Sequence, residues 1–98
     1  MELWEYTKQN IENERLEAVK HLRQRGGVVE NDVSWERLTG VFEELHRKKL
    51  AETVGLPESA SWPEIKSKLT ERADGKELYD QTERDVYGPY DSLLRRYD

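Results

Sequence analysis

The stretch Leu50–Leu69, LAETVGLPESASWPEIKSKL, constrains the fold of this chain most strongly, because it contains the end of one helix and the start of the next. Val54–Pro57, VGLP, is typical of a helix C-terminus, since glycine adopts a positive φ without strain and proline cannot continue a helix. Ser61 and Glu64 have the spacing of a capping box, and Pro63 between them suits the first turn of a helix. The stretch therefore predicts a helix–loop–helix.

Apolar residues recur at helical spacing on both sides of this stretch, and glycine or proline separates the segments. We expect helices at about residues 3–25, 34–54, 61–73, 77–87 and 91–97. Trp35, Leu38 and Phe42 belong to the densest apolar face, so the second of these helices is expected at the centre of the core. The predicted fold class is all-α: one domain over residues 1–98, a small bundle of four to five helices with the helix–loop–helix at its centre.

Several details of this assignment stay open. The second helix is either continuous or broken near Lys48. Gly40 inside it costs about 1 kcal/mol relative to alanine, and marks either that break or the close crossing of another backbone. Residues 77–87 form a helix or a hairpin, and the helix is favoured because Glu, Lys, Gln and Arg predominate. Either Asp32 or Ser34 caps the second helix.

Local patterns give three further expectations. Val28 and Val29 are expected in a packed loop after the paired glycines. Glu43 with Arg47, and Glu44 with Lys48, have the i,i+4 spacing of helical ion pairs. Asp74-Gly75 is expected to end the third helix.

The composition excludes several classes of protein. The 98 residues carry a net charge of −5, which argues against unspecific affinity for nucleic acid or for an anionic membrane. There is no cysteine, so disulfides, thiolate metal sites and a cysteine nucleophile are excluded. No apolar run approaches the roughly 20 residues of a membrane helix, and no apolar signal-peptide block begins the chain. We therefore expect an intracellular protein without a membrane partner.

The chain offers little for catalysis. Its two histidines, His21 and His46, lie near basic helix ends and are expected to be solvated or capping. Asp80, Glu83 and Asp85 form an acidic cluster that is expected to be a solvated face. Metal-ligand spacings and a glycine-rich phosphate loop are absent. We expect no catalytic residue, no cofactor and no metal, and hence no enzyme.

A binding role follows from the small core and the many aromatic residues. Leu, Ile, Val and Phe make up 21 of the 98 residues, close to the level of disordered chains. Association with a partner would therefore add stability. Trp4, Tyr87 and Tyr90 are candidate contacts with a protein, and Asp80 and Asp85 would steer its approach. The predicted function is a non-enzymatic binding or regulatory module, an inhibitor or adaptor, with a homo-oligomer as a further option.

Four short blocks, taken in order, also resemble the AT-rich interaction domain, a helical DNA-binding family with a helix-turn-helix-like core. His21–Gly27, HLRQRGG, is similar to a helix end of that family with its paired glycines, and Trp35 follows at nearly the family's distance. Leu50–Ser61, LAETVGLPESAS, resembles the helix and serine-rich loop before the recognition helix. Tyr90–Asp98, YDSLLRRYD, resembles the closing helix. The chain departs from the pattern by insertions between the blocks and by lacking the family's first helix.

The resemblance implies an alternative function, the binding of duplex DNA, and a nuclear location. The helix after Ser61 would then lie in the major groove, with Lys66 and Lys68 as groove or phosphate contacts. The remaining candidate contacts to the DNA backbone are Arg23, Arg25, Arg95 and Arg96.

Overall fold

The computed structural model describes residues 3–90, and the side chains of residues 10–90. In this part of the chain all regular structure is helical. The elements are α1 (Leu3–Gln24), α2 (Trp35–Thr53), α3 (Trp62–Thr70), α4 (Gly75–Tyr87) and a short 3-10 helix, η1 (Gly88–Tyr90). The predicted small all-α single domain is therefore confirmed. The helix expected at 91–97 lies outside the described residues.

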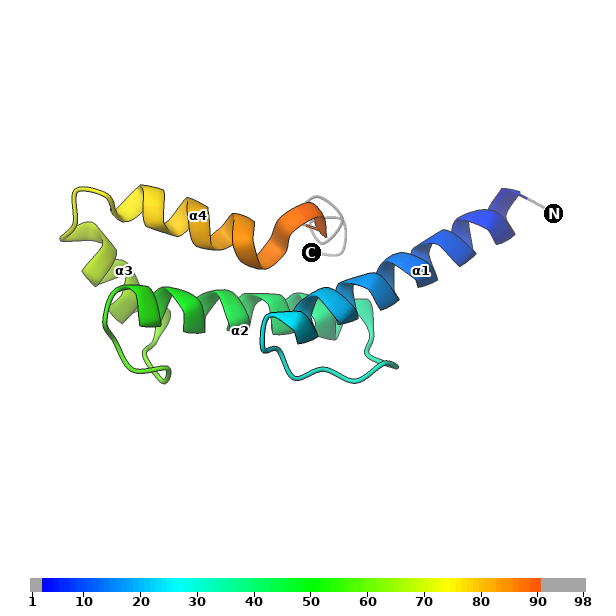
Figure 1. Ribbon diagram of the computed structural model, residues 1–98, viewed down its shortest axis with the longest axis horizontal. Coiled ribbons are helices and arrows are strands. Elements are labelled where there is room, and N and C mark those ends of the chain that lie inside the picture. Colours follow the sequence, from blue (N-terminus) through cyan, green and yellow to red (C-terminus); the bar gives the residue numbers. More distant parts are fainter. Residues whose placement is uncertain (1–2, 91–98) are drawn as a thin grey trace.

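The helix α2 is the central helix, and α1, α3 and α4 all pack against it (Figure 1). The helix α4 runs antiparallel along α2, and α3 packs against both of them at one end. The C-terminal half of α1 packs on the N-terminal half of α2, while the rest of α1 projects past the bundle. The molecule is therefore elongated, 55 × 23 × 20 Å.

The loop between α2 and α3 has the predicted geometry. Gly55 adopts a φ of 79°, and the amide of Leu56 donates to the carbonyl of Ala51 at 2.8 Å, which closes α2 with a Schellman motif. Ser61 accepts a hydrogen bond from the amide of Glu64, and the Glu64 carboxylate accepts one from the Ser61 amide. This capping box begins α3 as expected.

The open details of the helices are now settled. The helix α2 runs unbroken through Lys48, its cap is Ser34, and residues 77–87 belong to a helix. Apart from its own helix backbone and chain neighbours, no described atom lies within 4 Å of a side-chain carbon built at Gly40, so neither of the two alternatives for Gly40, a helix break or a close crossing, is found.

The end of α3 differs from the prediction. The helix stops at Thr70, and Gly75 begins α4 instead of ending α3. A side-chain carbon at Gly75 would lie 2.0 Å from the carbonyl oxygen of Leu69, so only glycine lets the two helices approach this closely.

The buried apolar side chains form two separate clusters along α2. The first cluster joins α1, the loop after it, the N-terminal half of α2 and the end of α4: Ala18, Val19, Leu22, Val29, Val33, Leu38, Phe42, Leu45 and Val86. The second joins the end of α2 to α3: Leu50, Ala51, Ala60, Ile65 and Leu69. Each cluster alone is small, so their connection matters for stability.

His46 connects the two clusters. Its ring is 2% exposed and lies 5.4 Å from the ring of Trp62 and 5.0 Å from that of Tyr79, both packed on the second cluster. Its other neighbour is Tyr87 of the first cluster, at 5.7 Å. The expectation of a solvated or capping His46 was wrong, because the tyrosines that bury it come from α4, far along the chain. His21 is also half-buried, and its Nε2 donates to the carbonyl of Val86 at 2.7 Å.

The two helical glycines predict opposite responses to the same change. Gly75→Ala should lower the free energy of unfolding by about 1–3 kcal/mol, because the new methyl group meets the Leu69 carbonyl. Gly40→Ala should raise it by up to about 1 kcal/mol, because open space surrounds the new group and alanine favours the helix. Urea unfolding followed by circular dichroism measures both. Equal effects of the two variants would contradict the described packing.

The buried imidazole predicts a pH dependence. Burial lowers the pKa of His46 from 6.5, with a weaker opposing effect from the backbone of Tyr79. Above pH 6.5 the ring is neutral in both the folded and the unfolded chain; as the pH falls, the unfolded chain takes up the proton first. Stability should therefore fall as the pH drops below about 7, by at most about 1.4 kcal/mol per pH unit from this one site.

The control for this prediction is His46→Phe, which keeps an aromatic ring and removes the titrating group. The free energy of unfolding of the variant should depend less on pH over the same range. If the free energies of unfolding of the wild type and of the variant change equally with pH, then unfolding does not change the protonation of His46 in this range.

Candidate functional site

Those candidate interface residues whose side chains are described do not meet on one surface. The ring of Tyr87 stacks on Phe42 at 5.4 Å, and the half-buried ring of Tyr90 packs against the same cluster. Burial, with a smaller contribution from Glu17, raises the pKa of the Tyr90 hydroxyl. Both tyrosines thus complete the core. Trp4 lies in α1, outside the residues whose side chains are described.

The two candidate acids, Asp80 and Asp85, are exposed on α4. Five residues apart on a helix, they point about 140° away from each other. The carbonyl of Asp85 accepts a hydrogen bond from Arg25 Nε at 2.8 Å. These two carboxylates therefore do not form one acidic patch on the helix.

The two arginines at the end of α1 that are candidate DNA contacts donate hydrogen bonds to backbone carbonyls of the chain itself. Arg23 donates from Nε and Nη2 to the carbonyl of Val29, at 3.0 and 2.7 Å. Arg25 joins α1 to the carbonyl of Asp85 on α4. Lys66 and Lys68 are exposed on α3, near the opposite end of α2 (Figure 1). Arg95 and Arg96 lie outside the described residues, so the described candidate cations are divided between the end of α1 and α3.

Arginine side chains fix both long loops. Arg47 donates from Nη1 to the carbonyls of Glu58 and Ala60, at 2.6 Å each, and so attaches the loop before α3 to α2. It also pairs with Glu44. The predicted pairs of Glu43 with Arg47 and of Glu44 with Lys48 are replaced by this i,i+3 pair.

The loop between α1 and α2 is attached in the same way. Arg15 donates to the carbonyls of Asn31 and Val33, the latter at 3.0 Å, and Arg23 holds the carbonyl of Val29. The amide of Gly27 donates to the carbonyl of Leu22 at 2.8 Å, which fixes the start of the loop. Hydrogen bonds to charged groups contribute roughly 1.5–3 kcal/mol each, so this loop is well anchored.

The side chain of Val28 is exposed to solvent, although hydrogen bonds fix the residues on both sides of it. Its side chain is 95% exposed, whereas that of Val29 is buried. The expectation that both valines pack in the loop was therefore wrong for Val28. The neighbours impose this exposure, because Gly27 is bound to the end of α1 and the Val29 carbonyl is bound to Arg23.

Val28 borders an open groove of about 400 Å³ between the loop and α2. We call it the α2 groove. Its lining consists of Gly26, Gly27 and Val28 on the loop, and Arg37, Gly40, Val41, Glu44, Leu45 and Lys48 on α2. The uncharged residues of this lining are apolar or glycine, and the charged ones, Arg37, Glu44 and Lys48, all belong to α2. Sequence reasoning missed this site, although the unexplained Gly40 was a signal for it.

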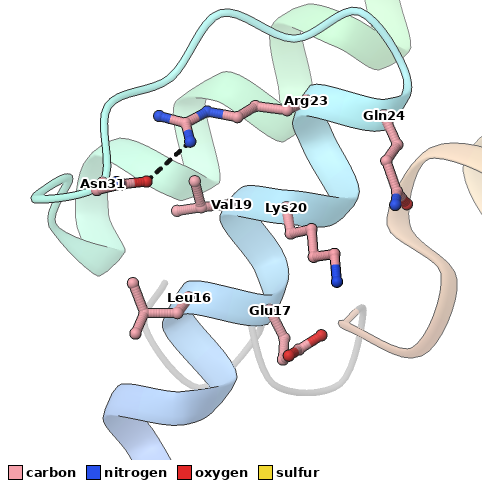
Figure 2. A pocket seen from close by; sticks show the side chains of 7 residues that line it. All are labelled: Leu16, Glu17, Val19, Lys20, Arg23, Gln24 and Asn31. Carbon is pink, nitrogen blue, oxygen red and sulfur yellow. Dashed lines mark hydrogen bonds between the residues drawn. The ribbon is translucent and has the colours of Figure 1, made fainter.

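Two other hollows are less suited to binding. One of about 520 Å³ lies on α1, where Figure 2 shows Leu16 on the side of Asn31 and Lys20 pointing away from it. The helix α1 therefore separates the residues that line this hollow into two groups. In addition, Arg23 Nη1 donates a hydrogen bond to Asn31 Oδ1 there, at 2.8 Å. Another, of about 370 Å³, lies between α3 and α4, and its lining includes no apolar side chain as exposed as Val28.

The described residues hold no group of three or more His, Cys, Asp or Glu side chains arranged to bind a metal ion. Between residues 3 and 90, no helix combines the length and the apolar character that crossing a membrane requires.

Comparison with known proteins found no match to a protein-family model, to a curated protein or to a solved structure. The resemblance to the AT-rich interaction domain thus stays a prediction.

The division of the cations predicts weak contact with DNA. The chain, at a net charge of −5, should show no detectable binding to random duplex DNA at tens of micromolar in low salt, measured by fluorescence anisotropy. Binding that is lost in the double variant Lys66→Glu with Lys68→Glu, and retained with Lys48→Glu, would contradict this expectation and favour the alternative function.

Proposed function

We propose that this chain is a non-enzymatic protein-binding module, an adaptor or inhibitor, and that its partner binds in the α2 groove. The observation that carries the proposal is Val28, an apolar side chain that is 95% exposed beside an apolar groove. Single exposed apolar residues are common and need no explanation. Val28 differs because its loop is anchored and because it continues the apolar floor of the groove.

Energetic reasoning supports a macromolecular partner. Full burial of a valine side chain contributes roughly 1.5–3 kcal/mol, and the half-buried Val41 extends the same surface. The groove is open, so a small molecule would remain largely in water. A protein segment lying along the groove would cover Val28 from above.

The proposal is tested with fold-neutral variants. Val28→Asp and Gly40→Gln place polar groups at two positions that are exposed and free of close contacts, so both variants should fold. Each should lose at least tenfold in affinity for partners captured from a lysate of the source organism and measured again as purified proteins.

The matched control is Leu16→Asp, which changes an exposed apolar residue outside the groove and should leave the affinity unchanged. Thermal unfolding verifies the fold of each variant. Partners that bind all three variants as tightly as the wild type would refute a role for the groove.

A further inference from the structure

We infer that the ligand of the α2 groove is an amphipathic α-helix whose apolar strip is flanked by acidic side chains. The inference rests on the proposed function and names the chemistry of the partner. Three independent features of the groove carry it: the shape of its lining, the bare backbone at Gly40, and the sign of its charges.

The shape of the groove suits a helix. Its lining residues on α2 follow one face of that helix, from Arg37 through Val41 and Glu44 to Lys48. The first and the last of them are eleven residues apart, which is about three turns or 16 Å. The opposite wall is the short segment Gly26–Val28. A second helix lying along α2 contacts such a face through side chains every three or four residues, the usual mode of helix-in-groove recognition.

Gly40 and the loop glycines allow a close approach. A glycine inside an exposed helix reduces its stability relative to alanine, and no described element contacts Gly40 in return. All three glycines line the groove, and an added side-chain carbon would meet open space at Gly40 and Gly26, whereas at Gly27 it would meet Leu22. An incoming helix therefore meets backbone instead of side chains at the middle of the groove, so its axis lies close to α2.

The charges at the groove are positive on balance. The lining contains Arg37, Glu44 and Lys48. The carboxylate of Glu44 is paired with Arg47, and this hydrogen bond, followed by the charges of Arg47 and Lys48, lowers its pKa against the effect of burial. Arg37 and Lys48 remain at the two ends of the strip, in a chain whose net charge is −5.

These two cations favour acids on the partner. Acidic side chains about eleven residues apart on a ligand helix lie the same three turns apart as Arg37 and Lys48. The net negative charge of the chain acts at longer range, and physiological salt screens it beyond about 8 Å. At contact distance the local cations therefore decide which ligand binds more tightly.

The test uses two synthetic helical peptides of about 18 residues with the same leucine and alanine strip. One carries glutamate, and the other lysine, at two flanking positions eleven residues apart. Each is titrated into the isotope-labelled full chain, and amide shifts in nuclear magnetic resonance give the site and the Kd. The glutamate peptide should shift Val28, Gly40 and Val41, and should bind about tenfold more tightly than the lysine peptide at physiological salt. Its advantage should shrink as salt is added.

A charge-reversed variant separates local from overall charge. Arg37→Glu with Lys48→Glu should reverse the preference between the two peptides. Lys66→Glu with Lys68→Glu makes the same change in net charge on α3, outside the groove, and should leave the preference intact.

The possible outcomes are distinct. Equal binding of both peptides in the groove, or tighter binding of the lysine peptide, overturns the acidic ligand and leaves the proposed function standing. If neither peptide binds, the helical ligand is overturned. The proposed function is still tested separately, by the affinity of the groove variants for the captured partners. Self-association of the wild type that Gly40→Gln abolishes, measured by sedimentation, identifies a second copy of this chain as the occupant and also overturns the inference.

Discussion

The packing of the His46 imidazole among the rings of Trp62, Tyr79 and Tyr87 holds this small protein together. Two apolar clusters lie along α2, and neither is large enough to order the whole chain. His46 contacts aromatic residues of both. Its Nε2 has no hydrogen-bond partner among the described atoms, so the ring contributes packing at the expense of an unsatisfied polar group.

The two faces of α2 have different roles. His46 faces α4 and the core, whereas Lys48, two residues later, points about 200° away toward the groove. Substitutions at the exposed groove positions, Val28, Gly40 and Lys48, therefore leave the aromatic contacts untouched. This separation makes variants at Val28 and Gly40 informative, because a loss of binding need not mean a loss of fold.

Much of the fold is predictable because its signals are local. The glycine at 55 and the capping box at Ser61 determine where helices end and begin within a few residues. The burial of His46 is not local, since its cover comes from tyrosines more than thirty positions away. The end of α3 was missed for a different reason: Gly75 is required by the close approach of the Leu69 carbonyl, six residues earlier, and not by a helix stop.

The candidate site was harder to predict than the fold. Tyr87 and Tyr90 suggested an interface, but tyrosine also suits the edge of a small core, where a polar tip stays near water. The exposure of Val28 depends on Arg23 holding the next carbonyl, a contact with no sequence signature. Gly40 visibly contradicted the local preference for other residues inside a helix, and such violations often accompany function.

The arginine side chains that fix the two loops differ from His46 in one respect. A guanidinium keeps its charge at any pH that proteins experience, so Arg15, Arg23 and Arg47 continue to hold their carbonyls when the imidazole takes up a proton. Mild acid therefore acts on the joint between the helices and spares the loop attachments. Acidification therefore reduces the stability of the packing at His46 without changing the charge of the arginine that fixes the groove wall to the end of α1.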